Sequence, residues 1–321
     1  MNSRNLIICD REMEYASRLA KYLEGKKELA LQVKICDSPE QAALIRRESG
    51  AEILLIDERI SIDKKELQKI PQVIWLSSSV TGKKEGEDVR RIFRYQKSED
   101  IYAGLVQVLA ESGAGVNWGI HKKERGKLIG VYSPVRRLGQ TAFAIGKGME
   151  LAKTENVLYV NLESYAGFGG YFPEEKEKNL SMLLYYAKQE LGNPGLLIAM
   201  IVKHLGNLDY IPPVSFPEDL KTVTGKEWIR ILEEILSRSI YDVLILDLGD
   251  CIQGLFDILN KCDVVYMPMA DDQIAVSKLY QFEEILCRQG YGEVWERMIR
   301  CDIRGTVKVK DIEAVRSVTG D

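Results

Sequence analysis

The sequence contains little histidine and no closely spaced cysteine pair. Its 321 residues include only two histidines, and its six cysteines are scattered without a CxxC spacing. Protein zinc sites draw their ligands from histidines and from such cysteine pairs. We therefore expect no zinc site. Because the cysteines show no disulfide-like framework, we read them as thiols of a protein that resides in a reducing compartment.

Long apolar runs are also absent, and neither sign of charge dominates. No apolar stretch approaches the ~20 residues of a membrane-spanning helix, and residues 1–12, MNSRNLIICDRE, do not resemble a signal peptide. The 44 basic and 48 acidic residues leave a net charge of −4, so no nucleic-acid partner is expected. Residues 307–321 lack a basic amphipathic stripe, so no direct membrane anchor is evident. We expect a cytoplasmic protein.

The length and one glycine-rich segment predict two domains. An apolar fraction of 45% and a charged fraction of 29% are those of globular protein, and 321 residues exceed one small domain. Residues 111–127 contain four glycines and a cluster of charges, a composition typical of an exposed connector. The predicted organisation is a domain at 1–112, a linker at 113–126 and a second domain at 127–321.

The first third of the chain alternates between apolar runs and amphipathic segments. This alternation predicts a doubly wound parallel sheet. The predicted strands are residues 6–9, 31–36, 52–56, 73–76 and 92–95, and the predicted helices are residues 14–23, 39–45 and 101–109.

Polar residues that follow these strands resemble the pocket of the receiver domain of response regulators. Asp57 matches the phospho-acceptor, Ser77 the hydroxyl residue and Lys97 the lysine. Of the acidic pair that holds Mg²⁺ in that family only Asp10 is present, next to Arg11. The resemblance implies a flavodoxin-like fold and a pseudo-receiver that serves as an interaction module. An aspartate that merely ends a strand is the structural alternative.

A second strand–loop–helix segment begins at residue 128. An apolar run, LIGV, leads into the loop SPVRRLG and then into the helical run TAFAIGKGMELA. This context is typical of a phosphate-binding loop, whose backbone amides and helix N-terminus face phosphate oxygens. Of the pattern GxxxxGK[ST], Gly139 and Thr141 are present, but the lysine position holds Gln140.

Further along the chain, the apolar run YDVLILDLGD at residues 241–250 predicts a buried strand that ends in acids. Its Asp247 has the position of a Walker B aspartate, which would hold Mg²⁺ through water, opposite the hydroxyl of Thr141. The alternative is a buried central strand whose terminal aspartate caps a loop. The order after a phosphate-type loop favours the first interpretation.

Taken together, residues 127–285 resemble the MinD/ParA family of deviant-Walker ATPases, and within it the CpaE/TadZ pilus-assembly proteins. A receiver-like domain before such an ATPase is typical of CpaE/TadZ. The segments that carry the resemblance are VYSPVRRLGQTAFA, VLYVNLES, NLSMLLYY, LDYIPPVSFPEDL, YDVLILDLGD and CDVVYMPMADDQIAVSK, in the order of the family. The resemblance implies a P-loop NTPase-like fold, ATP and Mg²⁺ as cofactors, and a homodimer with residues 250–260 near its interface.

Several positions depart from the family's KGGVGKT loop. The signature lysine falls on Val135, and Glu163 replaces an aspartate that positions the attacking water. Loss of one such electrostatic contact typically lowers the rate by about 10²–10³, so hydrolysis is expected to be weak or absent. ATP binding is left open. The predicted nucleotide-binding residues are Arg136, Arg137, Gly139, Gln140, Thr141, Ala142, Glu163 and Asp247, with Thr141 and Asp247 as Mg²⁺ ligands.

The resemblance implies a localisation or scaffold factor for assembly of a Tad-type (type IVc) pilus and secretion machine. Its partners would be components of that machine, and it would act at the cell pole or the inner face of the membrane through them. Two alternatives stay open. One is an active ATPase that cycles between monomer and dimer, with Arg136 or Arg137 replacing the lysines. The other is a phospho-regulated protein that acts through Asp57.

Overall fold

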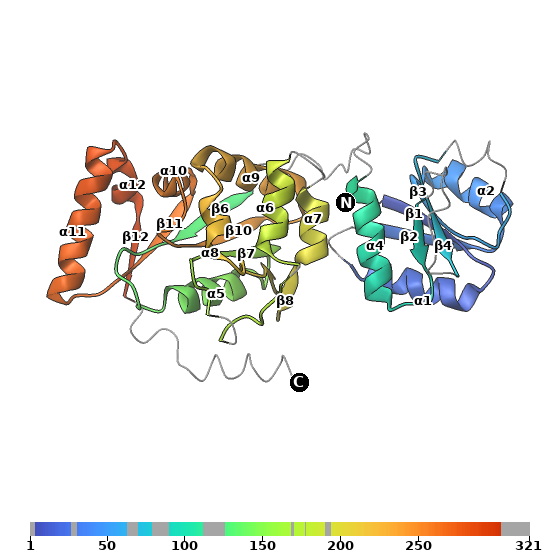
Figure 1. Ribbon diagram of the computed structural model, residues 1–321, viewed down its shortest axis with the longest axis horizontal. Coiled ribbons are helices and arrows are strands. Elements are labelled where there is room, and N and C mark those ends of the chain that lie inside the picture. Colours follow the sequence, from blue (N-terminus) through green and yellow to red (C-terminus); the bar gives the residue numbers. More distant parts are fainter. Residues whose placement is uncertain are drawn as a thin grey trace. The chain divides into compact units, whose positions relative to one another are not determined.

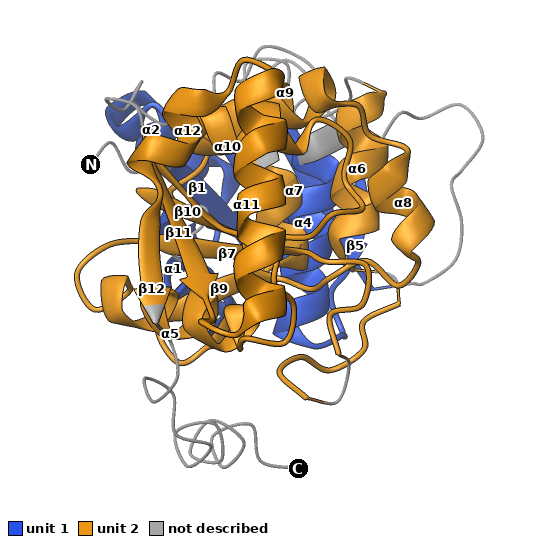
Figure 2. Cartoon of the chain, turned by 90° about the vertical axis from the view of Figure 1, so that its left-hand side faces the viewer, with its two compact units in different colours: residues 1–121 blue, residues 122–321 orange. Residues whose placement is uncertain are grey.

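The computed structural model describes residues 4–26, 31–62, 70–78, 90–111, 126–167, 170–176, 178–189 and 194–302. The chain divides into two compact units, Met1–His121 and Lys122–Asp321 (Figure 2). Each unit contains a mainly parallel sheet flanked by helices, which confirms the predicted α/β class with two parallel-sheet domains. Of the predicted linker, only Gly126 lies within the described residues.

Unit 1 is built on a five-stranded sheet in the order β2-β1-β3-β4-β5, with every adjacent pair parallel. The five predicted strands are all present, within one or two residues of the predicted ends. The strands are β1 (Arg4–Cys9), β2 (Leu31–Cys36), β3 (Ile53–Asp57), β4 (Gln72–Ser77) and β5 (Arg91–Phe93). Because β5 ends at Phe93, Arg94 is the residue at its carboxyl end.

Among the described residues of unit 1, three helices cover the sheet: α1 (Met13–Glu24), α2 (Pro39–Ser49) and α4 (Ser98–Glu111). Helices α1 and α4 contact each other, whereas α2 and α4 lie on opposite sides of the sheet (Figure 1). On the α2 side, Ile7, Leu54 and Ile56 pack with Ala42 in a buried apolar cluster. Burial of both sheet faces explains why the strands are nearly continuous apolar runs.

Unit 2 is built on a seven-stranded sheet in the order β12-β11-β6-β10-β7-β9-β8. All adjacent pairs are parallel except β8 and β9, which are antiparallel. The sequence did not predict the edge strands β8 and β12, which have three and four residues. The strands are β6 (Lys127–Val131), β7 (Val157–Leu162), β8 (Lys203–Leu205), β9 (Leu208–Ile211), β10 (Val243–Leu248), β11 (Val264–Met269) and β12 (Ile299–Asp302).

Helices cover both faces of this sheet. Helix α5 lies on one face, and α6, α7, α9 and α10 lie on the other (Figure 1). Within the part of the chain that is described, no helix is long and apolar enough to cross a membrane. The helices are α5 (Gln140–Leu151), α6 (Leu180–Lys188), α7 (Pro194–Ile201), α8 (Pro217–Lys221), α9 (Gly225–Arg238), α10 (Leu255–Lys261), α11 (Gln273–Arg288) and α12 (Gly292–Arg297).

The segment expected near a dimer interface contributes apolar side chains to the core of unit 2. Ile252, Ile258 and Leu259 are 5%, 0% and 0% exposed, respectively. Packing within the unit accounts for these three apolar residues. The place of residues 250–260 near a dimer interface stays a prediction.

In both sheets the polar residues of interest lie at the carboxyl ends of the strands. Strand β1 is adjacent to β3, and β6 and β7 lie on either side of β10. Loops that follow neighbouring parallel strands meet at one edge of the sheet, where open α/β folds bind their ligands. Each unit therefore has one candidate site.

Candidate functional site

The first candidate site, the unit 1 pocket, begins with two buried carboxylates. Asp10 follows β1 and Asp57 ends β3, and both are 0% exposed. The two strands pair in parallel, so the two side chains lie at the same edge of the sheet. Burial of ionised carboxylates is unfavourable unless cations or hydrogen-bond donors accompany them. The nearby arginines supply both.

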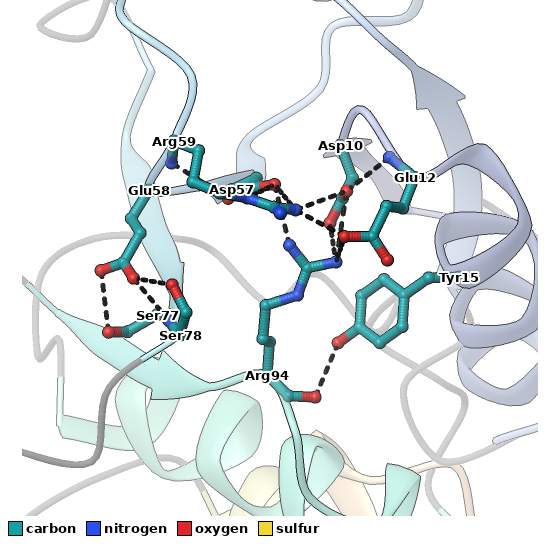
Figure 3. Close-up of polar contacts among 9 residues, drawn as sticks. All are labelled: Asp10, Glu12, Tyr15, Asp57, Glu58, Arg59, Ser77, Ser78 and Arg94. Carbon is teal, nitrogen blue, oxygen red and sulfur yellow. Dashed lines mark hydrogen bonds and ion pairs between the residues drawn. The ribbon is translucent and has the colours of Figure 1, made fainter.

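Arg94 lies between the two aspartates, as Figure 3 shows. Its Nη1 is 2.8 Å from Oδ2 of Asp57, and its Nη2 is 3.3 Å from Oδ2 of Asp10. The Tyr15 ring lies 4.7 Å from the guanidinium carbon, and the Tyr15 hydroxyl donates to the backbone carbonyl of Arg94 at 3.2 Å. Arg94 is 1% exposed. The guanidinium is thus a buried cation in fixed contact with two anions.

Arg59 covers the same cluster from the solvent side. Its Nε donates to both carboxylate oxygens of Asp57 at 3.0 and 2.9 Å, and its Nη2 lies 2.6 Å from Oδ2. The same Nη2 donates to Oε1 of Glu12 at 2.8 Å. Burial opposes ionisation of Asp57, but the hydrogen bonds from Arg59 and the charge of Arg94 hold its pKa below the ordinary value. For Asp10, burial dominates and raises the pKa.

The other two predicted residues of this pocket are placed differently. The Ser77 hydroxyl donates to Oε2 of Glu58 at 2.8 Å, and the backbone amide of Ser78 donates to the other oxygen of the same carboxylate (Figure 3). Lys97 is exposed and its carbonyl accepts the amide of Ile101 at the start of α4. The structure therefore brings Asp10 and Asp57 together, whereas Ser77 is bound by Glu58 and the basic residue beside Asp57 is Arg94.

Sequence reasoning missed Glu12, Arg59 and Arg94. A signal was present for Arg94, because it directly follows the apolar pair Ile92 and Phe93. Ending the predicted strand at Phe93 would have placed Arg94 at the edge of the sheet where the pocket lies. For Arg59 the signal was its position two residues after Asp57, where its backbone amide donates to the aspartate at 3.0 Å. Such short-range bonds are common after a strand-ending aspartate.

The second candidate site, the loop–helix site of unit 2, consists of residues 132–139 and the first turn of α5. Gly139 precedes the helix with φ 79°, a left-handed conformation that glycine adopts without strain. Arg137 also has a positive φ, 67°. Backbone amides of such a loop and of a helix N-terminus attract anions. The predicted strand–loop–helix arrangement is present.

The Gln140 side chain ties this loop to the end of β10. Its Oε1 accepts the backbone amide of Ser133 at 2.8 Å. Its Nε2 donates to Oδ1 of Asp247 at 2.7 Å and to the carbonyl of Leu248 at 2.9 Å. One neutral amide thus bridges the start of the loop and the carboxyl end of the neighbouring strand.

Asp247 is 0% exposed and its carboxylate has neutral partners. Oδ2 accepts the Tyr159 hydroxyl at 2.8 Å and the Asn161 amide at 3.1 Å, while Oδ1 accepts the amide of Gln140. Burial raises the pKa of Asp247, and these hydrogen bonds oppose the shift. Both oxygens thus already accept hydrogen bonds from side chains, so direct coordination of Mg²⁺ by Asp247 would compete with these donors.

Glu163 follows β7 and lies against the same cluster. Its Oε2 accepts the Thr141 hydroxyl at 3.3 Å. Burial, and then the charge of Asp247, raise the pKa of Glu163 to about 7. The loop after β10 is close by: a Cβ added at Gly249 would lie 2.9 Å from the Cα of Glu163. The Glu163 amide donates to Oδ1 of Asn161, whose side-chain amide donates to Asp247. Gln140, Thr141, Glu163 and Asp247 therefore belong to one network.

Arg136 of the loop forms its ion pair outside this network, with Asp250. Nη2 of Arg136 is 2.5 Å from Oδ2 of Asp250, and the two side chains are 53% and 52% exposed. The Tyr132 hydroxyl donates to the other oxygen of Asp250 at 2.8 Å. Arg137 is exposed, and Ala142 is half-buried in the first turn of α5. The sequence analysis did not identify Tyr159 and Asn161, because it considered polar residues at or after strand ends and these two lie inside β7.

No protein-family model matches the sequence, and no curated protein matches it. Several solved structures share part of its fold. A plasmid partition protein from Borrelia burgdorferi is 16% identical, with 61% of this chain and 98% of that chain aligned, at a TM-score of 0.42. A ParA family ATPase from Chlorobium tepidum TLS is 18% identical, with 60% and 81% aligned, at 0.47. The ATP complex of a McdA variant from Cyanothece is 17% identical, with 61% and 78% aligned, at 0.43. At such TM-scores these likenesses carry no argument about function.

Proposed function

We propose that this chain is a MinD/ParA-type protein of the CpaE/TadZ kind that serves as a localisation or scaffold factor for a Tad-type (type IVc) pilus and secretion machine. The observation that carries the proposal is the bridge from Ser133 through Gln140 to Asp247. The loop keeps the strand–loop–helix form of a phosphate-binding loop, but the neutral amide of Gln140 takes the place of the cation that such a loop has at its centre. A receiver-like unit before this loop–helix unit further supports it.

In this role the loop–helix site binds a nucleotide for assembly rather than for turnover. The phosphates would lie against Gly139, Thr141, Ala142 and the N-terminus of α5. Hydrolysis is weak or absent because catalysis of phosphoryl transfer depends on neutralising the charge of the γ-phosphate, and neither Gln140 nor Val135 carries a charge. Arg136 is held by Asp250 and supplies charge only when that pair separates.

The proposed assembly is a homodimer that contacts components of the pilus machine. The protein would reach the cell pole or the inner face of the membrane through those partners. The near-balanced charge, −4 over 321 residues, supports protein partners over nucleic acid.

The test combines pilus assembly in cells with phosphate release by the purified protein. Thr141→Ala removes a hydroxyl that a working ATPase needs, and in this structure that hydroxyl donates a long hydrogen bond, of 3.3 Å, to Glu163. We expect gene deletion to abolish pili, Thr141→Ala to restore them, and wild-type phosphate release to stay at the level without protein. Release by the wild-type protein, together with loss of pili in a folded Thr141→Ala variant, would identify an active ATPase instead.

A further inference from the structure

We infer that Arg94 is the resident cation of the unit 1 pocket, occupying the place between Asp10 and Asp57 that a divalent metal would need. Unit 1 then keeps its pocket closed by its own side chains, independently of Mg²⁺ and of phosphoryl transfer to Asp57. This inference rests on unit 1 alone, so it stands or falls separately from the nucleotide and pilus proposal.

The position of the guanidinium is the first support. Arg94 lies 2.8 Å from Asp57 and 3.3 Å from Asp10, and its side chain is 0% exposed, as are both carboxylates. The Tyr15 ring against the guanidinium restricts its movement. A metal ion bridging the two aspartates would have to displace this buried group, and a displaced arginine would leave hydrogen bonds and a cation–π contact unmade.

The charge of the pocket is the second support. Three carboxylates, those of Asp10, Glu12 and Asp57, face the two guanidiniums of Arg59 and Arg94. Three negative and two positive charges leave one net negative charge, which solvent screens at half-exposed Glu12. Adding a divalent cation would invert the sign of the cluster and bring it close to Arg94, which is electrostatically unfavourable in a buried site.

The hydrogen bonds of Asp57 are the third support. Oδ1 accepts from the backbone amide and Nε of Arg59, and Oδ2 accepts from Nε and Nη2 of Arg59 and from Nη1 of Arg94. A carboxylate attacks phosphorus through an oxygen lone pair, and both oxygens are engaged here by charged donors. Such charge-assisted bonds are strong, so the aspartate is a poor nucleophile.

The residues at the end of β4 are held by hydrogen bonds that do not involve Asp57. The Glu58 carboxylate accepts hydrogen bonds from the Ser77 hydroxyl and from the amide and hydroxyl of Ser78. These bonds hold the Ser77 hydroxyl on Glu58, so its position does not depend on a phosphoryl group on Asp57. Hydrogen bonding to Ser78 and Ser77 also lowers the pKa of Glu58, in accord with an ionised acceptor.

The first experiment uses the full-length wild-type protein and needs no variant. Its thermal unfolding is followed with and without millimolar MgCl₂ or MnCl₂, and labelling is measured with the small phosphoryl donor acetyl phosphate. We expect the same unfolding temperature with and without metal, and no label above that of Asp57→Asn. A rise in unfolding temperature that saturates with metal, or label that Asp57→Asn removes, would overturn the inference.

The second experiment replaces the cation. Arg94→Met should lower the unfolding temperature of unit 1, and MnCl₂ should raise it again as the metal takes the vacated place. Arg18→Met is the matched control, because Arg18 pairs with Glu14 on the surface with 80% of its side chain exposed. It should leave both stability and metal response unchanged. If Arg94→Met has the unfolding temperature of the wild type, Arg94 is not the resident cation. The same conclusion follows if the variant is destabilised and MnCl₂ does not raise its unfolding temperature.

A double variant covers the case in which Arg94→Met does not fold. Asp10→Asn with Arg94→Met removes one anion together with the cation. The charges that remain on Glu12, Asp57 and Arg59 are then closer to balance than those of the cluster in Arg94→Met alone. We expect this variant to be more stable than Arg94→Met and to show at least a tenfold weaker response to MnCl₂. A double variant less stable than Arg94→Met would show that the two side chains do not compensate each other.

Discussion

Nε2 of Gln140 lies 2.7 Å from Oδ1 of Asp247, while Oε1 of the same side chain accepts the amide of Ser133 at 2.8 Å. The first residue of α5 thereby links the loop after β6 to the end of β10. An amide can donate and accept at once, whereas a lysine ammonium can only donate. The residue that replaces the expected lysine is therefore an integral part of this site's hydrogen-bond network.

Gln140→Lys should increase nucleotide affinity. The ammonium restores a positive charge beside the phosphate-binding amides, and a hydrogen bond to a charged group contributes about 1.5–3 kcal/mol, about a 10- to 100-fold change in Kd. Calorimetric titration with ATP in the presence and absence of MgCl₂ measures it. Gln140→Leu, which removes all three hydrogen bonds of this side chain without adding charge, is the control and should bind no tighter than the wild type. Equal affinity of Gln140→Lys and wild type would argue against a phosphate site at this loop.

Tyr159→Phe should destabilise unit 2. The Tyr159 hydroxyl donates to Oδ2 of Asp247 at 2.8 Å and accepts the Asn161 amide at 3.1 Å, so its loss leaves buried polar atoms with fewer partners. We expect a loss of about 1–3 kcal/mol in the free energy of unfolding. Tyr210→Phe is the comparison, since Tyr210 packs on the same Phe172 ring and, within the described contacts, no hydrogen bond of its hydroxyl is found. Urea unfolding should show a larger loss of free energy of unfolding for Tyr159→Phe than for Tyr210→Phe. Equal losses would mean that the hydrogen bonds of the Tyr159 hydroxyl do not stabilise unit 2.

The sequence was sufficient for the five strands of unit 1 and for β6 and β10 of unit 2, because buried parallel strands are nearly uniform apolar runs. All six residues of β10 are buried, and so are all five of β3. Aspartates that end such runs, Asp10, Asp57 and Asp247, could be located for the same reason. The short edge strands β8 and β12 have no comparable run, because an edge strand of three or four residues buries little apolar surface.

The partners of those aspartates could not be predicted, because they depend on sheet order and on side-chain length. In unit 1, β4 lies between β3 and β5, so a residue after β5 must reach across one strand to contact Asp57. Arg94 is long enough and lies directly at the strand end, whereas Lys97 is three residues further and exposed. In unit 2, the glutamine at the lysine position suggested only the loss of a contact to phosphate. The folded structure reveals that Gln140 instead makes three hydrogen bonds within the protein, to Ser133, Asp247 and Leu248.

Asp250→Asn should free Arg136 for anion binding at little cost in stability. The ion pair is about half exposed, and such pairs contribute about 0.2–1 kcal/mol. The asparagine oxygen can still accept the Tyr132 hydroxyl. We expect ATP to bind several-fold more tightly and with a steeper dependence on salt, measured by titration at two ionic strengths. Adding Arg136→Gln to Asp250→Asn should abolish the gain; a gain that persists would mean that Arg136 is not its source.

The pH dependence of stability should change in Glu163→Gln. Burial and the charge of Asp247 raise the pKa of Glu163 from 4.5 to about 7, so the folded protein holds a proton that the unfolded chain has released. The resulting stabilisation is fully present below pH 4.5 and is lost as pH rises to about 7. The free energy of unfolding of the wild type, relative to that of Glu163→Gln, should therefore fall across this interval and level off above it. Urea unfolding at a series of pH values measures the difference, with Glu155→Gln, an exposed acid of the same unit, as the control. Parallel profiles for the wild type and Glu163→Gln would show that Glu163 ionises normally in the folded protein, and the network around Asp247 would then have to be more open to water than its burial indicates.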